Sequence, residues 1–166
     1  YKNSIVMAIN ISSSKGGDIK KILNSSNYVL GDLLLQYNSK GEIINTKVFK
    51  RGAMIVLPTT DGGYIVGGNF EKNENEKGIC ITKIDSKFKI QWERYLGGSG
   101  TDILDDIDIT EKNNIIVTVT TTSNDGDFSP QNQIDFYKKD FNAGIVEYDN
   151  NGKLIWKKII GGGNYD

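Results

Sequence analysis

The stretch Gly152-Lys153-Leu154-Ile155-Trp156-Lys157-Lys158-Ile159-Ile160-Gly161-Gly162 recurs 64 residues earlier as Phe88-Lys89-Ile90-Gln91-Trp92-Glu93-Arg94-Tyr95-Leu96-Gly97-Gly98. A third copy runs from Gly41 to Gly52, with Asn45 in the tryptophan position and Arg51-Gly52 in place of the glycine pair. Repetition on this scale indicates an array of one supersecondary unit. Fold and function are therefore to be interpreted unit by unit.

Three further segments recur around this one. Short β-branched and aromatic runs bounded by Gly, Asn and Asp indicate strands at 4–11, 61–70 and 112–121. Runs at 32–37, 79–84 and 143–148 each lead through a short polar turn into the next apolar run, as in a hairpin. A fourth run occupies 53–57 and 103–109. We therefore predict four antiparallel strands per unit and no helix of useful length.

Such units, repeated every 45 to 65 residues with one aromatic and a glycine pair, fit β-propeller blades better than a sandwich or a barrel. The predicted fold is all-β, with one domain over 1–166 that holds a partial first blade (1–52), a second blade (53–102) and a third blade (103–166). Eleven strands are visible, one short of three full blades. About four to eight blades close a ring. We therefore expect either a fragment of a larger propeller or a homo-oligomer that completes the ring.

Charge and composition exclude several function classes. A formal net charge of -1, without a basic run, gives no footprint for nucleic acid. No apolar run reaches the roughly 18 residues of a membrane-spanning helix. The chain has no histidine, so Ser-His-Asp, Cys-His and histidine-ligated metal chemistry lose their central residue. Cys80, the single cysteine, lies in an apolar run and is expected to be a small buried hydrophobe.

These repeats resemble those of secreted bacterial β-propeller proteins, in which an Asp-Gly-Gly-Tyr strand is followed by a Trp strand, a Gly pair and an Asp. The matching residues are Asp61-Gly62-Gly63-Tyr64, Trp92 to Gly98 with Asp102, Trp156 to Gly162 with Asp166, and Thr122 to Asp127. Kelch and quinoprotein propellers are more distant in appearance. The resemblance implies an extracellular or cell-surface location. It specifies the fold much better than an activity, because one fold carries many functions.

The acidic run Asp105-Asp106-Ile107-Asp108 is the first candidate site. The aligned positions of the preceding unit hold Met54, Ile55 and Leu57, so the carboxylates are not part of the shared architecture. Strand alternation predicts Asp106 and Asp108 on one face and Asp105 on the other. A cation site, a paired-carboxylate hydrolase or lyase site, and a solvated channel wall are the alternatives.

The long segment 122–142 is the second candidate. Asp125 and Asp127 flank a glycine, as in calcium loops, although no closing glutamate follows at the expected spacing and Asx turns explain the same composition. Calcium is the only cofactor that this pattern suggests. Aromatic residues give the segment the composition of a recognition surface or of a loop pinned to the blade edge: Phe128, Phe136, Tyr137 and Phe141.

Trp92 and Trp156 occupy equivalent positions and are expected to lie in the core between blades, not in sugar platforms. The leading hypothesis is a noncatalytic binding or scaffolding module that displays blade loops to a protein or glycan partner. The rivals are a hydrolase or lyase domain that uses the acidic strand, and a structural spacer of a cell-surface protein.

Overall fold

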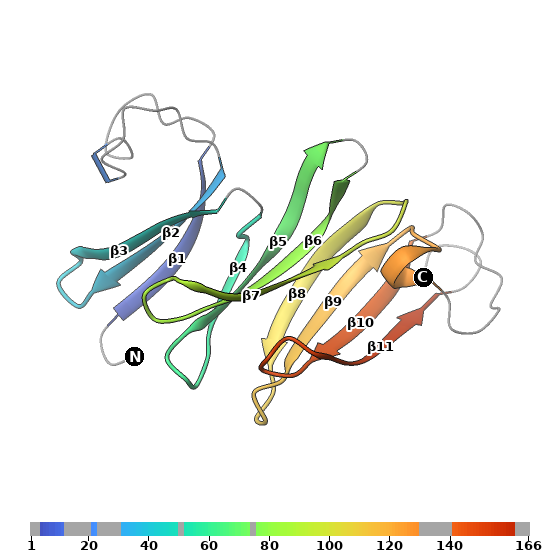
Figure 1. Ribbon diagram of the computed structural model, residues 1–166. Coiled ribbons are helices and arrows are strands. Elements are labelled where there is room, and N and C mark those ends of the chain that lie inside the picture. The colour runs from blue at the N-terminus through green and yellow to red at the C-terminus, as the bar shows by residue number, and fades with distance from the viewer. Residues whose placement is uncertain are drawn as a thin grey trace.

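The computed structural model describes residues 4–11, 21–22, 31–49, 52–73, 76–129 and 141–161. Within these ranges the chain forms eleven strands in three antiparallel sheets, together with one short 3-10 turn, η1 (Figure 1). The prediction of an all-β, antiparallel chain is confirmed. In the same ranges no helix has the length and apolar character needed to cross a bilayer.

The strands of each sheet follow one another in the chain. The first sheet contains β1 (Ser4–Ile11), β2 (Gly31–Asn38) and β3 (Ile43–Phe49). The second contains β4 (Ile55–Pro58), β5 (Tyr64–Asn73), β6 (Glu76–Ile84) and β7 (Ile90–Leu96). The third contains β8 (Asp102–Ile109), β9 (Ile115–Thr121), β10 (Asn142–Tyr148) and β11 (Leu154–Ile160), and η1 (Gly126–Phe128) follows β9.

The predicted hairpins form in all three sheets, as β2–β3, β6–β7 and β10–β11. One turn closes each of them. The side-chain oxygen of Asn38, Asp85 or Asp149 accepts hydrogen bonds from the backbone N–H groups two and four residues later. In the second sheet these backbone donors lower the pKa of Asp85. The repeat therefore encodes its hairpins through one local Asx turn.

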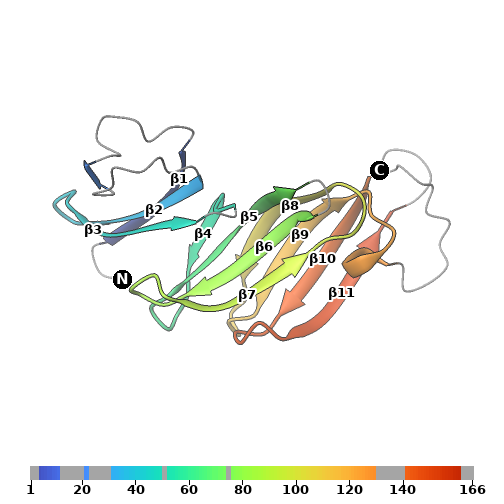
Figure 2. The ribbon, with the colours of Figure 1, turned by 45° about the horizontal axis from the view of Figure 1, so that its top comes forward.

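The three sheets stack face to face in chain order, with the second sheet in the middle (Figures 1 and 2). One core cluster joins the second and third sheets and includes Ile65, Ile81, Leu104 and Val117. Another joins Leu34 and Phe49 of the first sheet to residues of the second. The middle sheet is therefore covered on both faces.

At both junctions between sheets, a backbone N–H of the later unit donates to a side chain of the sheet before it. The N–H of Ala53 donates to Oδ2 of Asp32 in the first sheet at 2.7 Å. The N–H of Leu104, one repeat later, donates to Oδ1 of Asn69 in the second sheet at 2.8 Å. Ala53 and Leu104 occupy equivalent positions in their units, whereas the two acceptors lie in non-equivalent strands, β2 and β5.

Candidate functional site

The acidic strand β8 contains a β-bulge that changes which way its carboxylates face. The pairing register shifts between Leu104 and Asp106, so that Asp106 lies opposite Thr118 and Asp108 opposite Ile116. Asp105, inside the bulge, accepts a hydrogen bond from Thr120 Oγ1 at 2.8 Å. The prediction that Asp105 lies on the opposite face is wrong, because the extra residue of a bulge breaks the period of two.

All three carboxylates are exposed, on the face of the third sheet that points away from the second. Oδ1 of Asp106 and Oδ1 of Asp108 each accept the N–H of the following residue, at 2.8 and 2.7 Å. In the described ranges no three His, Cys, Asp or Glu side chains converge as metal ligands. The geometry is that of a solvated acidic face.

Asp125 and Asp127 bind backbone amides of the β7–β8 connection. Oδ1 of Asp125 accepts the N–H of Ser99 at 2.7 Å, and Oδ2 of Asp127 accepts the N–H of Gly97 at 3.1 Å. The hydrogen bond from the Ser99 amide lowers the pKa of Asp125. These contacts pin the segment after β9 to the neighbouring connection. Calcium binding at this loop stays a prediction.

Phe128 and Phe141, the two aromatic residues of the loop that the structure describes, have different environments. Phe128 is fully buried in the core between the second and third sheets, so its assignment to a binding surface is wrong. The turn η1 directs its ring inward, where burial of a large apolar side chain is favourable. Phe141 is exposed. Phe136 and Tyr137 lie outside the described residues.

The two tryptophans differ in their surroundings. Trp92 packs against the core between the second and third sheets, as predicted. Trp156 is 42% exposed, so the prediction of a buried position is wrong for it. Its indole N–H donates to the Glu147 carboxylate on the same face. Trp156 lies on the outer face of the third sheet, over which the described part of the chain places no further sheet.

The repeated acidic motif residues hold loops together. Oδ2 of Asp102 accepts hydrogen bonds from the Gly98 N–H at 2.8 Å and from Ser123 Oγ at 3.0 Å. Lys83 is almost completely buried, and its Nζ contacts Oδ2 of Asp61 at 2.7 Å. Partial burial opposes ionisation of Asp61, but hydrogen bonds from Lys83, Thr59 and the Gly63 amide outweigh it and lower its pKa to about 2. Both carboxylates are structural.

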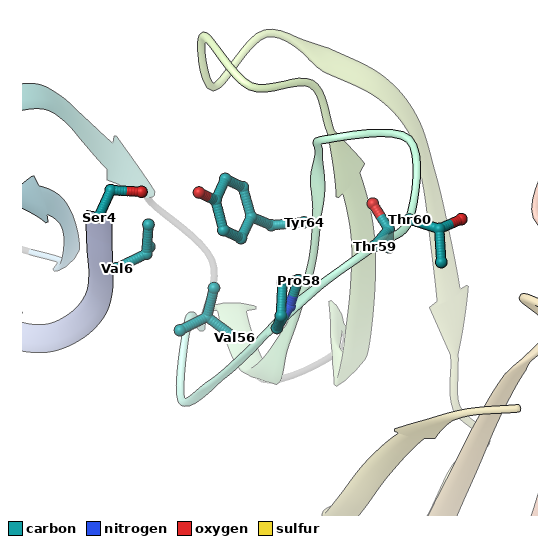
Figure 3. A pocket seen from close by; sticks show the side chains of 7 residues that line it. All are labelled: Ser4, Val6, Val56, Pro58, Thr59, Thr60 and Tyr64. Atoms are coloured by element: carbon teal, nitrogen blue, oxygen red, sulfur yellow. The ribbon is translucent and has the colours of Figure 1, made fainter. Parts of the chain in front are cut away.

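A cleft of about 350 Å³ between the first and second sheets was not predicted from the sequence. Figure 3 shows Ser4 and Val6 of β1 on one side and Val56 and Pro58 on the other, with the Tyr64 ring projecting toward β1. Thr59 and Thr60 complete the lining. No motif could reveal this cleft, because its walls come from two repeat units that only the folded stack brings together.

The cleft lies beside an edge strand. In the second and third sheets the first strands, β4 and β8, pair with β5 and β9. In the first sheet the equivalent of β5 and β9 is β1, which pairs with β2 alone within the described ranges. No strand of the described ranges pairs with the other edge of β1.

No protein-family model matches the chain, and no curated protein matches it either. It is similar to the crystal structure of a protein of unknown function from Bacteroides caccae, with a TM-score of 0.53 and 13% sequence identity. The match covers 80% of this chain and 39% of that one. At this identity the likeness concerns the fold alone.

Proposed function

We propose that the chain is an arc of β-propeller sheets of an exported bacterial protein and acts as a noncatalytic binding or scaffolding module. Two observations support the propeller assignment. The backbone N–H groups of Ala53 and Leu104, at equivalent positions of successive units, each donate to a side chain of the preceding sheet. The repeats also resemble those of secreted propeller proteins, which supports a location outside the cell or at its surface.

The edge of β1 beside the cleft, which pairs with no described strand, is the observation that carries the binding function. A row of free backbone N–H and C=O groups is a template for an extended peptide, which adds as a further strand. The cleft offers apolar walls from Val6, Val56 and Pro58, with hydroxyl groups from Ser4 and Thr60. Alternate side chains of an added strand would enter it.

The partner that this edge fits is therefore an extended segment of a protein. A regular row of backbone groups matches a second backbone, which favours a protein over a glycan. The added strand would run antiparallel to β1, as β4 runs to β5 and β8 to β9. The hydrolase or lyase alternative has less support, because Asp105, Asp106 and Asp108 lie on an exposed face.

The probe is a peptide with the sequence of residues 101–110, which contains β8, the first strand of the third sheet. We expect this fluorescein-labelled peptide to bind the chain more tightly than a scrambled peptide of the same composition, as measured by anisotropy. Val6→Thr, which keeps the shape of the side chain but adds a hydroxyl to the cleft wall, should weaken binding by about five- to tenfold.

Met7→Thr is the matched control, because Met7 is the next residue of β1 and points to the opposite face. It should leave the affinity unchanged. Equal binding of the native and scrambled peptides would contradict strand addition and leave a structural spacer as the better description. An equal loss in the two variants would place the peptide elsewhere than in the cleft.

A further inference from the structure

The contact between the second and third sheets is built around one tryptophan and one glycine. The ring of Trp92 lies over Gly152, where an added Cβ would stand only 2.8 Å from the indole. The indole N–H donates to the carbonyl oxygen of Asn150 at 3.0 Å, and Arg94 Nε donates to the carbonyl oxygen of Gly152. The β10–β11 turn therefore forms the surface that binds the Trp92 indole.

At the contact between the first and second sheets, the positions of the large and the small residue are exchanged. The first sheet carries the small Asn45 in the tryptophan position. The turn of the second sheet carries Phe88 in the glycine position, where it is buried in one core cluster with Leu34. Between the second and third sheets the large side chain, Trp92, comes from the earlier sheet. Between the first and second sheets the large side chain, Phe88, comes from the turn of the later sheet. At both contacts, therefore, one of the two equivalent positions holds a large residue and the other a small one.

The two ends of the stack carry the two halves of such a contact. The outer face of the third sheet presents Trp156, the equivalent of Trp92. The turn of the first sheet presents Gly41, with a φ of 76° like the 74° of Gly152. Among the described residues no atom lies within 4 Å of a Cβ built on Gly41, whereas the Trp92 ring fills that space at Gly152.

A surface pocket of about 430 Å³ lies at the Gly41 turn. Tyr37, Ser39 and Gly41 line it. They stand in the same turn positions as Tyr148, Asn150 and Gly152, the residues around Trp92. Ser4, Ile5 and Asn38 complete the lining, and Ile5 is strongly exposed. The pocket therefore has the same residue pattern as the β10–β11 turn against which Trp92 packs.

We propose that this pocket binds the indole of Trp156 from a second copy of the chain, in a head-to-tail contact. On docking, the Trp156 N–H leaves the Glu147 carboxylate and, by equivalence with Trp92, donates to the carbonyl oxygen of Ser39. Lys158, in the position of Arg94, donates to the carbonyl oxygen of Gly41. A second copy is the occupant because one chain holds both halves of the contact. The contact is confined to the Gly41 turn, since Ile11, Leu33 and Leu35 on that face of the first sheet are already buried in a cluster with Ile22.

This contact is heterologous, since each copy offers a different surface to its neighbour. Two chains close into a ring if the rotation per sheet allows it, and otherwise the contact continues into longer assemblies. The proposal concerns the end faces of the stack and does not depend on peptide binding at the edge of β1.

Sedimentation of the 166-residue chain at micromolar concentrations tests the proposal. We expect a mass of at least twice that of one chain, and a blue-shifted tryptophan emission on association. Trp156→Ala and Gly41→Phe should each weaken association by at least about tenfold. Phe88 shows that phenylalanine fits this turn position, with a φ of 62°, so Gly41→Phe is expected to fold.

The mixture of the two variants is the decisive measurement. Trp156→Ala keeps an intact pocket and Gly41→Phe keeps an intact tryptophan, so an equimolar mixture should associate although each variant alone does not. Phe141→Ala, which removes an exposed aromatic just before β10, should change nothing. A wild-type chain that stays monomeric, variants that still associate, or a mixture that does not associate would each overturn the proposal.

Discussion

Replacement of Gly152 by alanine tests the packing of Trp92 directly. The new Cβ would lie 2.8 Å from one ring carbon of Trp92 and 3.0 Å from two others, well inside ordinary van der Waals contact. Gly152 also has a φ of 74°, which an alanine adopts with strain. Two penalties therefore add at this position: one from the backbone and one from the ring.

Gly41→Ala separates the two penalties. Gly41 has the same turn position and a φ of 76°, but no atom of the part of the chain that the structure describes lies within 4 Å of its Cβ position. The left-handed backbone alone should cost about 1 to 2 kcal/mol of unfolding free energy. Overpacking against the ring should add about 1 to 3 kcal/mol at Gly152. Gly152→Ala is therefore expected to destabilise by about 2 to 5 kcal/mol.

A double-mutant cycle with Trp92→Ala gives the coupling. Without the ring, Gly152→Ala should cost no more than Gly41→Ala, which leaves a coupling of about 1 to 3 kcal/mol. All variants carry Trp156→Ala, so that association of chains does not affect the comparison. Urea unfolding followed by circular dichroism gives each free energy. Equal costs at Gly152 and Gly41, or no coupling to Trp92, would refute the packing of the indole over the turn.

Phe88→Ala should cost about 3 to 5 kcal/mol, because it removes a buried ring packed edge-on against Tyr64. Phe88→Gly should cost less than Phe88→Ala, since glycine relieves the φ of 62°, and the reverse order of urea midpoints would contradict the strain. The pKa of Asp61 is about 2 in the fold and 3.8 ordinarily, so its ionised form stabilises the fold above about pH 4 and this contribution disappears as the pH falls toward 2. Asp61→Asn leaves Lys83 buried beside a neutral partner. It should lower the urea midpoint at pH 6, and lower it much less at pH 2. A difference that does not depend on pH would argue against the ion pair. Asp102→Ala should cost about 2 to 4 kcal/mol by orphaning buried donors, and an unchanged midpoint would show that its hydrogen bonds are dispensable.

The hairpins could be predicted because their determinants are local. The residues at Asn38, Asp85 and Asp149 each fold their own turn through bonds to the next four residues. Such bonds depend little on the rest of the chain. Alignment of the repeats therefore placed β2–β3, β6–β7 and β10–β11 correctly.

The face of the sheet on which each acidic residue of β8 lies could not be predicted from the local sequence. Alternation holds only while a strand pairs without interruption, and the bulge in β8 adds a residue that no local signal marks. Asp105 consequently bonds to Thr120, on the same side of the sheet as the side chains opposite Asp106 and Asp108. A bulge is a property of the strand pair, not of one strand.

Burial of the aromatics depends on neighbours far away in the sequence. Trp92 and Trp156 have the same local sequence pattern, but only Trp92 has a following sheet over it in the described part of the chain. Phe128 lies in a loop with the composition of a recognition surface, yet it fills the core beside Leu104. The cleft between β1 and β4 likewise arises from two units. Composition alone cannot distinguish these environments.

The order of the strands has a consequence for how the molecule folds. Because every sheet consists of consecutive strands, each can form from short-range contacts before it meets its neighbours, and this favours fast folding. Opening should then begin at the end sheets, as in arrays in which each repeat contacts only the next. The amides of Ile79, Ile81 and Ile84, in the sheet that is covered on both faces, should exchange with solvent most slowly.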